Sequence, residues 1–121
     1  MSPATTEDLL LLARQGFERR PGDAAVRERA LQALRPWLVE ERFAAYRPQL
    51  ASLVKRGRFE SLVDAFWQVI PFGTGGRRGP VGIGPNRINP WTLGTSVQGH
   101  AEILKETYPG EEVAVVIAWD V

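Results

Sequence analysis

Residues 72–79 read Phe-Gly-Thr-Gly-Gly-Arg-Arg-Gly, and residues 84–89 read Gly-Pro-Asn-Arg-Ile-Asn. Eight of the twelve glycines lie between Gly73 and Gly99, and from Ala65 to Ala101 there are three arginines and no carboxylate. Glycine lets backbone N–H groups approach a ligand closely, and arginine carries a planar, positively charged guanidinium group that can donate two hydrogen bonds to one phosphate. We call residues 72–79 the Gly/Arg loop. Its composition predicts either a phosphate-binding loop or a mobile surface loop with solvated charges.

Two better-known phosphate patterns do not fit the Gly/Arg loop. A Walker loop requires a lysine beside its glycines, whereas the two lysines of this chain are Lys55 and Lys105. A dinucleotide-binding fingerprint that starts at Gly73 requires glycine at position 78, which is Arg78. The spacing therefore argues against a nucleoside triphosphate or dinucleotide site. The combination of glycine amides and arginine favours a phosphate monoester over a polyanionic nucleic acid.

The order of these motifs resembles the α-D-phosphohexomutases, the family of phosphoglucomutases and phosphomannomutases. In that family a strand leads into an F-G-T-x-G-x-R-G loop, and a glycine-rich passage then ends in N-R-[MI]-N and a helix. Here the corresponding segments are the Gly/Arg loop, residues 86–89, and a helix expected from about Pro90. Gly75 and Arg77 depart from the family pattern, which has alanine, serine or aspartate at the first position and an aliphatic residue at the second. The resemblance extends from roughly Phe59 to Val121.

The resemblance implies an α/β fold that is incomplete in this chain. Residues 1–57 are expected to form a helical N-terminal extension, and residues 58–121 the N-terminal portion of the α/β/α layered first domain of a phosphohexomutase. The continuous apolar run of residues 113–119 suits a strand buried on both faces, and residues 69–72 are expected to be extended. Together with the intervening helix, these segments predict a βαβ-like order.

The resemblance also implies an activity and a site. A phosphohexomutase passes a phosphoryl group from a phosphoserine to a hexose phosphate and converts glucose 1-phosphate into glucose 6-phosphate through a bisphosphate intermediate. Thr74, Gly75 and Arg78 are then expected to line the active site beside the phosphoserine, with Arg78 as the principal contact. Arg77 receives no role in this interpretation.

The family's catalytic motifs do not occur in this sequence. There is no phosphoserine loop of the T-A-S-H-N-P kind, no magnesium loop of the D-G-D-x-D-R kind and no sugar-reading G-E-x-S-G loop. We therefore assign no catalytic or metal-binding residue and expect this chain alone to be inactive. Mg²⁺ and a hexose 1,6-bisphosphate activator are expected for the intact enzyme, and none is expected to bind this part of it. Hexose phosphate substrate and the remaining domains of the enzyme are the implied partners, without nucleic acid or membrane, in the cytoplasm.

The first seventy residues predict helices separated by turn residues. Thr5 or Thr6 and Asp23 suit helix N-caps, and Asn89 followed by proline suits the start of the helix after the loop. The aromatic face that contains Phe59 has helical spacing, which favours core packing over a ligand platform. His100, the only histidine, has no second ligand nearby and is interpreted as structural or exposed.

A second reading belongs to a different functional class. A noncatalytic module, in which the helical half binds a protein partner and the basic loop contacts an anion, would also explain the short chain. Nucleic-acid binding is disfavoured because fourteen acidic residues balance fifteen basic ones and no basic-aromatic platform is present. Asn86, Arg87 and Asn89 are compatible with either reading, because turn formation and helix capping explain them as well as ligand contact does.

Overall fold

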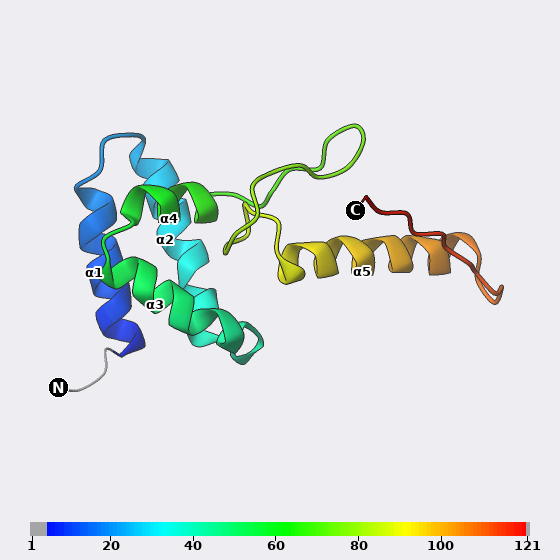
Figure 1. Ribbon diagram of the computed structural model, residues 1–121, viewed down its shortest axis with the longest axis horizontal. Coiled ribbons are helices and arrows are strands. Elements are labelled where there is room, and N and C mark those ends of the chain that lie inside the picture. The colour runs from blue at the N-terminus through cyan, green and yellow to red at the C-terminus, as the bar shows by residue number, and fades with distance from the viewer. Residues whose placement is uncertain (1–4, 121) are drawn as a thin grey trace.

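The computed structural model describes residues 5–120 and contains α-helices, one 3-10 helix and no β-strand in that range. The elements in chain order are α1 (Thr6–Glu18), α2 (Ala24–Val39), η1 (Glu41–Tyr46), α3 (Arg47–Lys55), α4 (Phe59–Phe66) and α5 (Pro90–Thr107). Helices α1 to α4 pack together, whereas α5 extends away from them after a long loop (Figure 1).

The expected α/β/α layered arrangement is wrong for the described residues. Residues 113–119 form neither a helix nor a strand, and Val116 and Trp119 are 94% and 83% exposed. Pairing in residues 5–120 is limited to two isolated bridges, Gly73 with Gly76 and Val81 with Ile88. A strand requires a second strand to satisfy its backbone hydrogen bonds, so an apolar run of strand-like composition does not form one by itself. The βαβ-like order is corrected to a helical architecture.

Three helices begin where the sequence places their caps. Thr5 accepts a hydrogen bond from the backbone N–H of Asp8, whose side chain accepts one from the backbone N–H of Thr5 in return. Asp23 caps α2 by accepting from the N–H of Ala25 at 2.7 Å. Asn89 caps α5 in the same reciprocal manner as Thr5 caps α1. These contacts satisfy backbone N–H groups that have no partner inside the helix.

The hydrophobic core lies among α1, α2, η1, α3 and α4. Apolar side chains at helical spacing meet there because each helix is apolar along one face. Its largest fully buried side chains are Phe17, Phe43, Phe66, Leu34, Leu38, Leu50, Leu62 and Val54. Helix α4 packs against both α1 and α2, so helices on either side of the expected boundary after residue 57 share this core.

The start of α5 is attached to the core through an aromatic contact. The ring of Trp91 meets that of Phe43 edge-on at 4.7 Å between centroids, and the Arg42 guanidinium lies over both rings. The backbone N–H of Trp91 donates a 3.3 Å hydrogen bond to the hydroxyl of Tyr46. After Thr92 the apolar side chains of Leu93, Val97 and Ile103 are exposed. Only the N-terminal end of α5 is therefore held by the helical core.

Candidate functional site

The Gly/Arg loop contains a tight turn whose tip is exposed. The backbone N–H of Gly73 donates to the carbonyl of Gly76 at 2.7 Å, and Gly76 has a φ of 119°, a conformation that favours glycine. Thr74 and Gly75 lie between these two residues at the tip of the turn, and both are exposed. An added Cβ on Gly75 would meet no atom within 4 Å. The backbone at the tip is therefore open to a ligand.

The three residues expected to contact phosphate lie around one depression. Thr74, Gly75 and Arg78 line it together with Pro71, and its volume is about 420 Å³. The Arg78 side chain is exposed, and no hydrogen bond or ion pair joins it to another residue in the range 5–120. An exposed guanidinium beside an open backbone turn is an arrangement that can accept an anion.

Arg77 points away from this depression and contacts α5. One terminal nitrogen of its guanidinium donates to the carbonyl oxygen of Thr92 at 3.2 Å, to the hydroxyl of Thr95 at 3.4 Å and to the hydroxyl of Ser96 at 3.0 Å. The side chain is half-buried, and its Nε is enclosed. The sequence assigned Arg77 no role, but the structure shows that it fastens the Gly/Arg loop to the first turns of α5.

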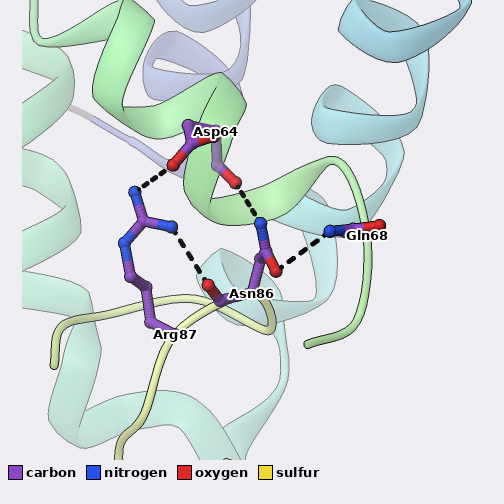
Figure 2. A network of polar contacts seen from close by, with 4 residues as sticks. All are labelled: Asp64, Gln68, Asn86 and Arg87. Carbon is purple, nitrogen blue, oxygen red and sulfur yellow. Dashed lines mark hydrogen bonds and ion pairs between the residues drawn. The ribbon is translucent and has the colours of Figure 1, made fainter. Parts of the chain in front are cut away.

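The segment that follows, which we call the docking loop (residues 80–89), lies against α4. The Asn86 side-chain amide donates to the carbonyl of Asp64 at 2.9 Å and accepts from the side chain of Gln68 at 3.3 Å. The Arg87 guanidinium donates to the carboxylate of Asp64 at 2.6 Å and to the carbonyl of Asn86 at 3.0 Å (Figure 2). Asn86 and Arg87 thus order the loop in this structure.

Asn89 is buried and connects the docking loop to α5. Its side-chain NH₂ group donates to the backbone carbonyls of Gly82 at 2.9 Å and Gly84 at 2.8 Å. Its side-chain oxygen, Oδ1, accepts from the backbone N–H of Thr92 at 3.0 Å. The hydroxyl of Thr92 donates back to the carbonyl of Arg87 at 2.8 Å. Every polar group of the Asn89 side chain is therefore engaged within the protein, which explains this residue by structure alone.

Sequence reasoning missed three residues that support the site. The capping-box spacing between Asn89 and position 92 was a usable signal for Thr92, because an N-cap residue and the residue three positions later often bond reciprocally. Asp64 and Gln68 lie near the end of α4, and no local pattern connects either residue to the docking loop. Their contacts depend on the packing of segments far apart in the sequence.

A magnesium ion has no evident site among the described residues. Within residues 5–120 no group of three or more histidine, cysteine, aspartate or glutamate side chains lies close enough to hold a metal ion. The resemblance implies magnesium for the intact enzyme, in a loop whose motif does not occur in this sequence. His100 is exposed on α5. None of the described helices is long and apolar enough to cross a membrane.

The chemistry that this site offers is anion recognition. Arg78 supplies a permanent positive charge, and the turn at Thr74 and Gly75 supplies exposed backbone. The Arg77 contacts hold the Gly/Arg loop against α5, and the Asn89 contacts hold the docking loop against the same helix. Comparisons of the chain with protein-family models, with curated proteins and with solved structures found no match.

Proposed function

We propose that this chain is the N-terminal part of a phosphohexomutase and that its Gly/Arg loop binds a phosphate group of a hexose phosphate. The observation that carries the proposal is the placement of Thr74, Gly75 and Arg78 around one depression. Arg77 supports it, because its side chain is committed to α5 and the neighbouring arginine is left exposed. In the mutase reaction the enzyme would interconvert glucose 1-phosphate and glucose 6-phosphate in the cytoplasm.

The role of this loop would be to hold and neutralise phosphate. Phosphoryl transfer depends on positioning and on charge stabilisation more than on covalent work by the protein. Arg78 can donate two parallel hydrogen bonds to phosphate oxygens, and the backbone at Gly75 can approach the same group. The nucleophile and the sugar-reading residues would come from other parts of the enzyme, so the 121-residue chain alone is expected to be inactive.

The decisive experiment is a coupled assay for the conversion of glucose 1-phosphate to glucose 6-phosphate, with magnesium and catalytic glucose 1,6-bisphosphate. It compares this chain with the product of the uninterrupted reading frame. We expect activity only in the longer product, and Arg78→Ala should reduce it by at least about tenfold because a charge-assisted phosphate contact is lost. Arg78→Lys keeps the positive charge but cannot donate two parallel hydrogen bonds, so its activity should lie between that of the wild-type protein and that of Arg78→Ala.

The matched control is Arg14→Ala, which removes the same charge from the exposed face of α1, away from the Gly/Arg loop. It should leave the rate unchanged. Full activity of Arg78→Ala would remove that residue from the proposed site. Activity of the 121-residue chain itself would show that a nucleophile is present after all.

A noncatalytic interaction module remains a second candidate because of one specific observation. Leu93 and Val97 on α5 are exposed, and so are Val116, Ile117 and Trp119 near the C-terminal end of the described residues. Leu93 and Val97 are four residues apart and therefore share one face of α5, and an exposed apolar face is a surface that can contact another polypeptide. This reading gains support if the longer product has no mutase activity while sedimentation of the 121-residue chain shows association that Val97→Ser weakens.

A further inference from the structure

A second cavity lies in the helical half of the molecule, apart from the Gly/Arg loop. Its walls come from the α1–α2 turn, the start of α2, the α3–α4 turn and α4, with Arg87 of the docking loop at one side. Its volume is about 660 Å³, which falls within the range of small-molecule sites. It shares no lining residue with the depression at Thr74 and Arg78.

The charged side chains that line this cavity are mainly basic. Four arginines from different segments, Arg20, Arg27, Arg58 and Arg87, share the wall with two carboxylates, Glu60 and Asp64. The surplus of two positive charges favours an anionic occupant. Because the arginines come from separate segments, only the folded chain gathers them in one place.

Two of the four guanidinium groups are already held in position. Arg27 donates from one terminal nitrogen to the carbonyl of Arg20 at 2.6 Å and to that of Gly22 at 2.9 Å. Arg87 is 13% exposed and is held by Asp64 and by the carbonyl of Asn86. A guanidinium that is held before the ligand arrives loses less side-chain freedom on binding.

The other two guanidinium groups are available to an incoming anion. The Arg58 side chain has no hydrogen-bond or ion-pair partner among residues 5–120, although its backbone N–H and carbonyl are bonded to Leu53 and Leu62. Arg20 meets Glu60 only at 3.8 Å, and the two side chains are 42% and 89% exposed. An exposed ion pair of this length is weak, so an anion in the cavity can replace it.

The remaining wall is apolar and includes an aromatic ring. Val26, Phe59, Val63 and Trp67 line the cavity together with the arginines. An inorganic ion would use only the charged part of this surface. Trp67 is the lining residue with an indole ring, and such a ring can stack with a planar ligand.

We propose that this cavity is a binding site for a phosphorylated small molecule that carries a ring, with its phosphate on the arginines and its ring against Trp67 and the apolar wall. The site is independent of the phosphohexomutase proposal, because it uses different residues and requires no catalytic chemistry.

The test is an NMR titration of the 121-residue chain with phenyl phosphate, in parallel with inorganic phosphate and phenol. The indole N–H signal of Trp67, assigned with a Trp67→Phe variant, reports binding at this cavity. We expect phenyl phosphate to shift this signal at concentrations at least about tenfold lower than either of the other two probes, since only it combines charge and ring. Equal potency of inorganic phosphate would overturn the proposed ring contact.

The chain offers a closely matched control for the arginines. Arg20→Ala with Arg58→Ala removes two cavity arginines, whereas Arg19→Ala with Arg56→Ala removes two exposed arginines that do not line the cavity. The first pair should weaken phenyl phosphate binding by about tenfold or more, and the second should leave it within about twofold. Equal weakening by both pairs would mean that net charge alone attracts the anion and would overturn the site.

An Arg78→Ala variant separates this proposal from the Gly/Arg loop. It should leave the Trp67 shift unchanged, whatever it does to mutase activity in the longer protein. Loss of the Trp67 shift in Arg78→Ala would place the anion at the loop and refute the cavity site. If circular dichroism shows that the double variant folds poorly, the single variants Arg58→Ala and Arg56→Ala can be compared instead. Both side chains are exposed, and only that of Arg58 lines the cavity.

Discussion

The guanidinium of Arg87 donates a 2.6 Å hydrogen bond to the carboxylate of Asp64, and this contact joins the docking loop to α4. The two side chains differ in environment, because that of Arg87 is 13% exposed and that of Asp64 is 63% exposed. Asn86 binds the backbone carbonyl of the same aspartate. The loop is therefore attached to the helix through both the side chain and the main chain of one residue.

A double-mutant cycle on Arg87 and Asp64 should give a coupling energy of about 0.5–1 kcal/mol, because the exposed carboxylate is screened by solvent. Urea denaturation of the Arg87→Ala, Asp64→Ala and double variants measures it. Arg87→Ala should cost more than Asp64→Ala, since it also removes the buried part of the arginine side chain. A coupling near zero would show that the main-chain contacts hold the loop by themselves.

Asn89→Ala should lower the free energy of opening the first turn of α5 by about 2–4 kcal/mol, because a helix cap and two bonds to glycine carbonyls are lost together. Amide hydrogen exchange in α5 measures this change. Asn89→Asp keeps the cap acceptor but replaces the donor to Gly82 and Gly84, so it should also be destabilising. An aspartate variant as stable as the wild-type protein would show that only the cap matters.

Gly84→Ala should destabilise the protein by about 2 kcal/mol or more, because Gly84 has a φ of 121° and an added Cβ would lie 2.6 Å from the carbonyl oxygen of Ala65. Gly75→Ala is the matched control, since a Cβ there meets no atom within 4 Å. It should change the stability by less than about 0.5 kcal/mol. Thermal or urea unfolding measures the stabilities of the two variants. Equal stabilities would contradict the role given to the backbone conformation of Gly84 and its contact with Ala65.

Arg77→Ala should loosen the Gly/Arg loop from α5, because it removes the guanidinium that donates to three acceptors on the first turns of that helix. We expect faster amide exchange at Ser96 and at residues 73–79, with a cost of about 1 kcal/mol in local stability. Arg78→Ala removes the same charge from the next residue and should leave exchange unchanged. If both variants exchange alike, the contacts of Arg77 do not hold the loop.

The candidate site was only partly predictable from the sequence. Thr74, Gly75 and Arg78 were expected from the family resemblance to line a phosphate site, which stays a prediction; the structure shows that the three line one depression, as residues of one short turn can. The function of Arg77 was not predictable, because its acceptors are supplied by α5, fifteen or more residues later. Asp64 was missed for the same reason, since its partner Arg87 is distant in sequence.

The sequence by itself determined the features that depend on near neighbours. Helix starts at Thr5, Asp23 and Asn89 follow from side chains that bond backbone groups two or three residues away, and helical spacing of apolar residues marks the core face of α4. Tertiary structure alone decided whether residues 113–119 pair as a strand, because a strand needs a partner that no local pattern supplies. It also decided which arginine is bound and which is exposed, because the acceptors for Arg77 come into reach only when α5 packs beside the loop.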